Sequence, residues 1–524
     1  MNIKLMDSSL RDGGNVNDWN FGGRVIEGII RDLNSSRIDI IELGYLRDVI
    51  YDQNRSLYNT IEEAKVNVLP TENNVEYSLM VQEDKWNWDN LVPCDGTIKH
   101  IRVSFHKIDV AEGLTLCKRV KDNGYVCHCN PINIMGYTDA ELLDLIEQIN
   151  ELHPDVFSIV DTFGSMNIDD IKRIDSLMHN NLLPDIGIAA HLHENLGLAF
   201  SLAQEFINYF ENKRDIIVDA SIMGIGRIPG NLCLELVMGY MNSSKEQEYD
   251  LDYIYDAIDD FIIKIKNENP WGYAVPYALS ASYNLHRTYP EFLIRKGKLK
   301  TKDIRCILES IDPSQRVIYN QEYIEKLYEE YININVEDDE VINTLSNELY
   351  NYDVLIVAPG KTISDFRQEM ISFLEKNECK IFTVNFLCEF LISDYAFFTN
   401  LKRLEYERYH LKDTKLIATS NLMHENLETD YIVNYLRLQK MGNEKIEDSV
   451  LCLLNLLSRL PVKNIYIAGF DGYKNKNSYY DKTLDNGYVG SDYSDKVKTI
   501  LHNVFSGLPL QFITPSYYWE DFND

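Results

Sequence analysis

The segment "IGIAAHLHEN" (residues 186–195) runs from consecutive apolar residues into two histidines spaced two positions apart. Side chains two residues apart on a β-strand point to the same face. His191 and His193 are therefore expected side by side at the end of a buried strand. Two interpretations are open: the pair is half of a metal site, or it is an ordinary polar strand end. Motifs elsewhere in the chain distinguish the two.

The first 300 residues alternate such apolar runs with amphipathic segments. A helix is predicted over residues 138–152, where Thr138 and Glu141 form a capping box. Strands alternating with helices indicate a parallel sheet covered on both faces, and eight units over about 250 residues predict a (β/α)₈ TIM barrel. The eight predicted strands are 3–6, 38–44, 77–81, 100–105, 125–130, 157–161, 186–193 and 216–222.

The predicted domain order is a barrel over residues 1–300, a helical and acidic connector over 301–350, and a second α/β domain over 351–524. The second domain is expected to be Rossmann-like, because apolar runs and helical segments alternate again. Its predicted strands lie within 353–361, 380–385, 395–400, 415–421 and 464–473. The fold class is therefore α/β throughout.

The composition narrows the range of partners. The chain has 51 Lys and Arg against 82 Asp and Glu, a net charge of −31. Such a balance argues against nucleic acid and anionic membranes, which need clustered basic residues. We find no apolar run long enough to span a membrane and no leader-like start. The nine cysteines include no CxxC pair. A reduced, cytoplasmic protein is the expectation.

In a TIM barrel, functional groups lie at the carboxyl ends of the strands. Asp12 follows the first strand in "DSSLRDGG" (7–14) and completes, with the two histidines, a ligand set for a divalent ion. Arg11 beside it can offset the charge of a developing enolate, and Glu42 is expected to orient Arg11. Lys4 and Lys99 lie at strand beginnings, which disfavours a Schiff-base mechanism.

Three motifs in this order, "DSSLRDG", "HLHENLGLA" and "GIGRIPGN", resemble the DRE-TIM metallolyase superfamily over about residues 1–300. The resemblance implies a divalent ion held by Asp12, His191 and His193, with Asn231 as a further ligand in the lyase branch. It favours Mn²⁺, while the ligand types leave Mg²⁺, Zn²⁺ and Co²⁺ open. It also implies that Arg11 stabilises the enolate of pyruvate or of an acyl thioester.

Within that superfamily, "IRVSFHK" (101–107) and the segment 272–290 are most similar to the 4-hydroxy-2-oxovalerate aldolase branch. The aldolase pattern has a histidine, the usual base, where this chain has Asn15. A neutral amide cannot accept a proton at pH 7, so another base is needed. His106 is the preferred candidate, and the others are Tyr137, Tyr273 and His286.

In the second domain, "LIVAPGK" predicts a strand followed by a tight turn that presents backbone N–H groups to an anion. "GFDGY" places a carboxylate at another strand end. The order of these segments resembles Rossmann-type bacterial sialyltransferases. That resemblance implies a nucleotide or sugar-phosphate site near Gly360, Asn385, Asn400 and Asp471, with Gly360 and Asp471 as the principal contacts. A domain that serves only for assembly is the alternative.

The leading functional hypothesis is a metal-dependent aldolase that cleaves or forms a 4-hydroxy-2-oxo acid through a pyruvate-type enolate. Its small-molecule partners would be a 2-oxo acid and an aldehyde, with a polyhydroxylated substrate from surface-sugar metabolism. One alternative is a Claisen-type acyltransferase that uses acyl-CoA at the same site. The other is a non-catalytic scaffold or binding module. We further expect a homo-oligomer.

Overall fold

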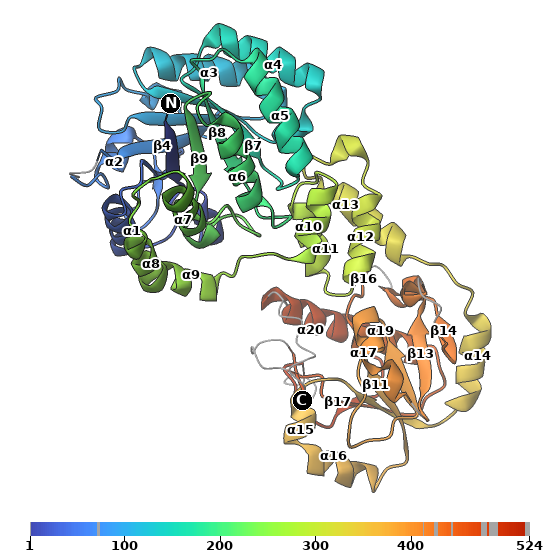
Figure 1. Ribbon diagram of the computed structural model, residues 1–524. Coiled ribbons are helices and arrows are strands. Elements are labelled where there is room, and N and C mark those ends of the chain that lie inside the picture. The colour runs from blue at the N-terminus through green and yellow to red at the C-terminus, as the bar shows by residue number, and fades with distance from the viewer. Residues whose placement is uncertain are drawn as a thin grey trace. The chain divides into compact units, whose positions relative to one another are not determined.

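The computed structural model describes residues 2–70, 74–411, 413–423, 428–441, 444–472, 479–480 and 491–518. The chain divides into two compact units, Met1–Thr288 with Asp312–Tyr319, and Tyr289–Ile311 with Asn320–Asp524. Each unit is an α/β fold built around its own parallel sheet (Figure 1). In the part of the chain that the structure describes, no helix combines the length and the apolarity needed to cross a membrane.

The first unit is a closed parallel barrel, which confirms the predicted TIM barrel. β1 pairs with both β2 and β9, so the eight barrel strands close into a ring. A two-residue strand, β3 (Leu57–Tyr58), adds to β2 and was not predicted. The barrel strands are β1 (Ile3–Asp7), β2 (Ile40–Leu46), β4 (Glu76–Gln82), β5 (His100–Phe105), β6 (Val126–Pro131), β7 (Val156–Asp161), β8 (Gly187–Leu192) and β9 (Ile216–Ala220).

Helices follow most of these strands and cover the outside of the barrel (Figure 1). The predicted capping box is present, since Thr138 and Glu141 each bond the other's backbone at the start of α4. The helices are α1 (Gly23–Ser35), α2 (Ile61–Lys65), α3 (Val110–Asp122), α4 (Asp139–Leu152), α5 (Ile168–Asn181), α6 (Ala199–Phe210), α7 (Leu234–Ser244), α8 (Leu251–Ala257), α9 (Ile263–Glu268) and α10 (Val275–Ser282).

The second unit contains a parallel sheet with the strand order β14-β13-β12-β11-β10-β17-β18 among the described residues. All five predicted runs form strands, and β14 and β18 extend the two edges. Tyr473, the last residue of the run 464–473, lies outside the described residues. The strands are β10 (Asp353–Val357), β11 (Cys379–Val384), β12 (Tyr395–Phe398), β13 (Lys415–Thr419), β14 (Tyr431–Val433), β17 (Ile465–Ala468) and β18 (Leu510–Phe512).

Helices precede this sheet in the chain and alternate with its strands. Residues 301–350, predicted as a connector, contain three of them and fall mainly within the second unit. A short antiparallel pair, β15 (Lys440–Met441) and β16 (Glu444–Lys445), lies apart from the sheet. The helices are α11 (Thr288–Arg295), α12 (Thr301–Glu309), α13 (Gln321–Ile332), α14 (Asp339–Glu348), α15 (Thr362–Asp365), α16 (Arg367–Leu374), α17 (Leu401–Glu407), α18 (Tyr435–Leu438), α19 (Ser449–Leu457) and α20 (Ser491–Phe505).

One buried carboxyl in the barrel layer generates a stability prediction. Asp175 on α5 is fully buried, and neither side-chain oxygen has a hydrogen-bond partner among the described residues. Burial, reinforced by Glu205, raises the pKa of Asp175 to about 8. Because this pKa is raised in the folded state, the protein loses stability as the pH rises from about 4 towards 8.

Asp175→Asn should therefore be more stable than the parent protein at pH 8.5, by an amount on the order of a few kcal/mol, with the advantage shrinking at pH 5. Thermal melting at the two pH values measures the difference. Asp169→Asn, an exposed change on the same helix, is the control. A melting difference for Asp175→Asn that does not change with pH would contradict the assignment.

Candidate metal centre

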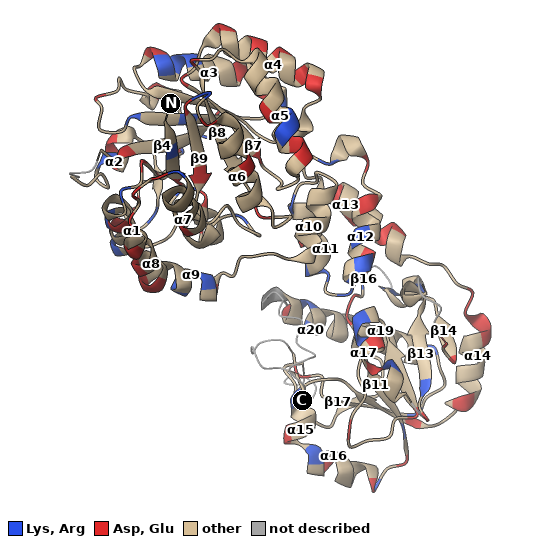
Figure 2. Cartoon of the chain, viewed as in Figure 1, with Lys and Arg blue, Asp and Glu red and all other residues tan. Residues whose placement is uncertain are grey.

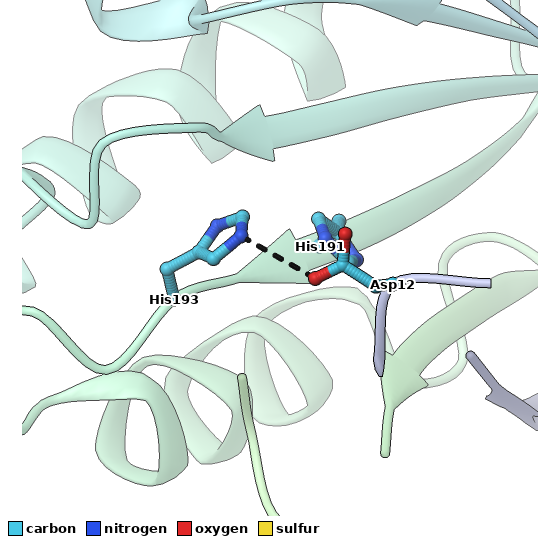
Figure 3. Close-up of side chains that lie close together, drawn as sticks. All are labelled: Asp12, His191 and His193. Atoms are coloured by element: carbon cyan, nitrogen blue, oxygen red, sulfur yellow. Dashed lines mark ion pairs between the residues drawn. The ribbon is translucent and has the colours of Figure 1, made fainter. Parts of the chain in front are cut away.

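Asp12, His191 and His193 converge at the carboxyl end of the barrel. Each offers one ligand atom, and these atoms lie within 4.8 Å of one another. Asp12 lies in the turn after β1, His191 near the end of β8 and His193 just beyond it (Figure 3). His193 Nε2 is 3.7 Å from Asp12 Oδ2, and all three residues are buried. The strand pattern thus places two imidazoles and one carboxylate around a common point.

Nδ1 of each histidine faces an oxygen, although only that of His193 forms a hydrogen bond. His193 Nδ1 lies 2.9 Å from the backbone oxygen of Asp161, and His191 Nδ1 lies 3.1 Å from Asp219 Oδ2. Burial lowers the pKa of His191, against the opposing effect of Asp219. With Nδ1 of each ring facing an oxygen, Nε2 is left to bind a cation, as outer partners of metal-ligating histidines typically arrange.

Arg11 keeps Asp12 ionised. Burial opposes ionisation of this carboxyl, but Arg11 and the two histidines outweigh it, and the pKa of Asp12 is well below its ordinary value. Arg11 Nη1 donates to Asp12 Oδ1 over 2.7 Å, and Arg11 Nε donates to Glu42 Oε2 over 2.7 Å. Arg11 Nη2 is buried without a hydrogen-bond partner among the described residues. One guanidinium donor therefore stays available for an oxyanion.

Asn231 lies against the same carboxylate. Its Nδ2 donates to Asp12 Oδ2 over 2.7 Å and to the backbone oxygen of Ile225 over 3.0 Å. Its Oδ1 is buried and has no partner in the described part of the chain, which costs about 1–3 kcal/mol for such an acceptor. A Cβ at Gly226 would come within 2.8 Å of Asp12 Oδ2, so glycine lets the backbone approach. A carboxylate, two imidazoles and an orphaned amide oxygen fit a divalent cation.

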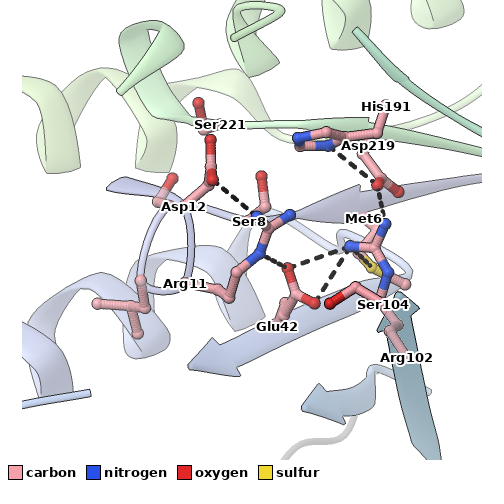
Figure 4. A network of polar contacts seen from close by, with 12 residues as sticks. Met6, Ser8, Arg11, Asp12, Glu42, Arg102, Ser104, His191, Asp219 and Ser221 are labelled. Carbon is pink, nitrogen blue, oxygen red and sulfur yellow. Dashed lines mark hydrogen bonds and ion pairs between the residues drawn. The ribbon is translucent and has the colours of Figure 1, made fainter. Parts of the chain in front are cut away.

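A chain of buried charges runs from the candidate metal ligands into the barrel interior (Figure 4). Arg102 is fully buried, and its Nη1 donates to both oxygens of Glu42 over 3.1 Å. Its Nη2 donates to Asp219, whose pKa lies at about 2 because Arg102 and His191 outweigh the effect of burial. Counting Arg11 and Asp12, three carboxylates face two guanidiniums. The surplus negative charge favours a bound cation.

The predictions from sequence did not include Asp219 and Arg102. Each stands in an otherwise apolar strand, "IIVDASI" and "HIRVSF". A charged residue inside a strand that is buried on both faces needs an opposite partner. That rule would have flagged both residues, although it does not say which partner each one meets.

Asn15, which stands in place of the aldolase pattern's histidine, has a bridging role. Its Nδ2 donates to the backbone oxygen of Asp12 over 2.8 Å, and its Oδ1 accepts from Arg227 Nε over 3.0 Å. It therefore links the carboxylate loop to the glycine-rich loop after β9. Residue 15 therefore fixes the guanidinium of Arg227 and does not itself provide a proton acceptor.

The four candidate bases lie in different surroundings. His286 lines a pocket of about 20 Å³ together with His193, Arg227 and Arg287. Burial, then the charges of Arg227, Arg287 and His106, lower the pKa of His286 to about 4. His106 immediately precedes the short turn 107–109 after β5 and is half-buried. Tyr273 is 64% exposed, and the buried Tyr137 hydroxyl has no partner among the described residues.

The residues predicted to contact a nucleotide or sugar phosphate lie together in the second unit. Gly360 N donates to the backbone oxygen of Gly469 over 2.8 Å, and Asp471 Oδ2 accepts from Thr362 N over 2.9 Å. A Cβ at Gly360 would lie 2.2 Å from that Gly469 oxygen, so only glycine fits there. Gly360, Asn385, Asn400 and Asp471 all line one cavity.

The family model described as HMGL-like matches residues 2–260. Residues 2–260 form an HMGL-like domain. It belongs to the DRE-TIM metallolyase superfamily, which confirms the resemblance seen in the sequence, and members of that superfamily are enzymes that use a divalent metal.

Two curated relatives share part of the chain. A 4-hydroxy-2-oxovalerate aldolase of Pseudoalteromonas translucida is 22% identical over 330 residues, 57% of this chain and 91% of its own length. A 2-isopropylmalate synthase of Bacillus velezensis is 24% identical over 253 residues, 44% of this chain. The match spans only 46% of the synthase, about half its length.

Solved structures also resemble the chain. The N-terminal domain of a Bacteroides vulgatus protein has a TM-score of 0.47 at 24% identity, covering 56% of this chain and 96% of that one. The carboxyl transferase domain of Rhizobium etli pyruvate carboxylase has a TM-score of 0.45 at 12% identity, covering 67% and 65%.

The HMGL-like domain's ligand set can be tested without knowing its substrate. Asp12→Ala or His191→Ala should reduce bound Mn²⁺ from about one ion per chain to none, because either change leaves only two of the three clustered ligand atoms. Asp219→Asn should weaken Mn²⁺ binding about 10–100-fold, the usual effect of losing an outer partner of a ligating histidine. Calorimetric titration of the metal-stripped protein with Mn²⁺ measures both effects.

Asp215→Asn is the matched control, because Asp215 is exposed and lies just before the same strand, β9. It should bind Mn²⁺ as the parent protein does. Full Mn²⁺ stoichiometry in folded Asp12→Ala protein would show that the ligand set is wrong.

Proposed function

We propose that the HMGL-like domain is a divalent-metal-dependent aldolase acting on a 4-hydroxy-2-oxo acid. The observation that carries the proposal is the free Nη2 of Arg11 beside Asp12, His191 and His193. A cation site with an adjacent, fixed guanidinium suits a reaction that develops negative charge on a carbonyl oxygen. The likeness to a 4-hydroxy-2-oxovalerate aldolase over 91% of its length supports the same assignment.

In the cleavage direction, a base takes the proton of the 4-hydroxyl and the C3–C4 bond breaks. The aldehyde leaves, and the electron pair moves to the 2-oxo oxygen to give the enolate, which then takes a proton at C3 to become pyruvate. A divalent ion held by Asp12, His191, His193 and Asn231 would polarise the 2-oxo carbonyl. Arg11, fixed by Glu42, donates to the enolate oxygen as its charge develops. Mn²⁺ is the proposed metal.

The pocket beside His193 suits His286 as the base better than His106. His286 lines that pocket with His193, whereas His106 is not among its lining residues. The pocket has room for about one water molecule. A 2-oxo acid therefore requires the side chains at its rim, such as Arg227 and Arg287, to shift when it binds. Two cations at the rim complement the carboxylate of such a substrate.

A second function is supported by the likeness to 2-isopropylmalate synthases. In that case the same groups would stabilise the enolate of an acyl thioester, and the product would form by attack on a 2-oxo acid. The geometry around Arg11 serves both reactions equally well, so the acyl carrier distinguishes them.

Turnover assays of the Mn²⁺-loaded full chain test the assignment. We expect metal-dependent release of pyruvate from 4-hydroxy-2-oxo acids, including polyhydroxylated ones from sugar metabolism, measured by coupled reduction to lactate. Arg11→Lys should lower kcat about 100-fold or more and retain Mn²⁺, because one ammonium nitrogen lacks the spread of guanidinium donors that reaches Asp12, Glu42 and the oxyanion together. Release of free thiol from acetyl-CoA with a 2-oxo acid, without pyruvate formation, would favour the acyltransferase. Absence of both reactions and of Mn²⁺ binding would favour a scaffold.

The base is tested by His286→Ala and His106→Ala. We expect His286→Ala to lower kcat about 100-fold or more while leaving Mn²⁺ affinity unchanged, since general-base catalysis contributes that much. His106→Ala should change kcat by less. The reverse order of effects would return the role to His106, and equal, small effects would exclude both residues.

A further inference from the structure

The second unit contains a cavity that the aldolase chemistry does not use. Its volume is about 650 Å³, within the range of small-molecule sites, and every lining residue belongs to this unit. Strand-end residues of β10, β11, β12 and β17 form its floor, among them Pro359, Asn385, Asn400 and Phe470. The cavity is therefore built by the carboxyl ends of the parallel strands.

The position in the sheet is the one expected of a ligand site. From β10 the chain builds outward in one direction through β11, β12, β13 and β14, whereas β17 and β18 lie on its other side. The order reverses between β10 and β17, and in open parallel sheets ligands bind outside the strand ends at such a point. Gly360 follows β10, Gly469 follows β17, and both line the cavity.

The charge of the cavity wall is opposite in sign to that of the chain. Among the described residues, six basic ones line it against five acidic ones, whereas the whole chain has 51 basic and 82 acidic residues. In Figure 2 basic residues mark the segment after α11 and the first turn of α17, both of which contribute to the wall. The basic residues are Arg295, Lys296, Lys298, Arg403, Lys440 and Lys445, and the acidic ones Glu329, Glu444, Glu447, Asp448 and Asp471.

Most of the acidic groups are already engaged. Asp448 accepts backbone N–H bonds from Val450 and Leu451 at the start of α19. Asp471 accepts from Thr362, and Glu329 pairs with Lys445 over 2.7 Å. These carboxylates therefore have structural partners, and they compete little with an anionic ligand for the basic residues of the wall.

Two of the basic groups have no ion-pair partner among the described residues. Lys298 Nζ donates to the Tyr435 hydroxyl and to the backbone oxygen of Glu447, and its charge also acts on the carboxylates of Glu447 and Asp448. Arg295 and Lys440 are exposed and form no ion pair with any described residue. A wall with this surplus of positive charge suits a ligand with more than one negative charge. The cavity is larger than a small inorganic anion, so we expect the ligand to carry an organic group as well.

We propose that this cavity binds a phosphorylated small molecule, with its phosphate against Lys298, Arg295 and Lys440. The sugar or nucleoside portion lies against the strand-end residues of β10, β11, β12 and β17. Nucleotides and sugar phosphates share this chemistry, and the test separates them. The site is independent of the metal centre, so it persists when the divalent ion is removed.

Calorimetric titration of the full chain in excess chelator tests the proposal, with inorganic phosphate, glucose 1-phosphate and uridine diphosphate as probes. We expect saturable binding of at least one organic phosphate, tighter than that of inorganic phosphate. Arg295→Glu combined with Lys440→Glu should weaken it about tenfold or more, because two attractive charges become repulsive. Both residues are exposed, so the variant should fold.

Lys376→Glu combined with Lys463→Glu is the control, since it makes the same change in net charge at exposed positions of this unit outside the cavity. Its affinity should match that of the parent protein. Tighter binding of uridine diphosphate would identify a nucleotide site, and tighter binding of glucose 1-phosphate a sugar-phosphate site. Absence of saturable binding by any probe, or equal weakening in the control, would overturn the proposal.

Discussion

The pairing of Arg11 with Asp12 is the constraint on which the barrel's polar interior depends. Burial alone would favour the protonated carboxyl, and the guanidinium reverses that preference. The same guanidinium is held by Glu42, which is held in turn by Arg102, which also binds Asp219 beside His191. Removing any member would leave a partner buried and uncompensated, so ligand geometry and barrel packing are energetically linked.

Much of the architecture was readable from the residues because parallel strands are buried on both faces. β2 and β9 are buried at every position, and each appears in the sequence as a nearly continuous apolar run. The strands that escaped prediction are short: β3, β14 and β18 at sheet edges, and the separate pair β15 and β16. A strand of two or three residues has too few side chains to show a pattern, and its pairing comes from the neighbouring strand.

The convergence of Asp12, His191 and His193 was predictable for a related reason, because the TIM barrel places strand ends at one rim and the motif spacing places these residues there. Asp219 and Arg102 were not, since their contact depends on how β5 and β9 face each other across the barrel interior, which no local pattern encodes. The position of His286 depends on the path of the chain after α10. Long-range register and loop conformation are the parts that a single sequence leaves open.

Asn15 shows how one residue sets the polar contacts at the rim. A histidine at that position would have been a proton acceptor, whereas the amide holds Arg227 and the Asp12 loop together. The rim gains a fixed cation where the aldolase pattern has a base, and the proton acceptor must then come from another element. His286 follows Leu285 into the same small pocket as Arg227. Its low pKa follows from burial and from those neighbouring cations, so the guanidinium that Asn15 positions also favours the neutral imidazole of His286.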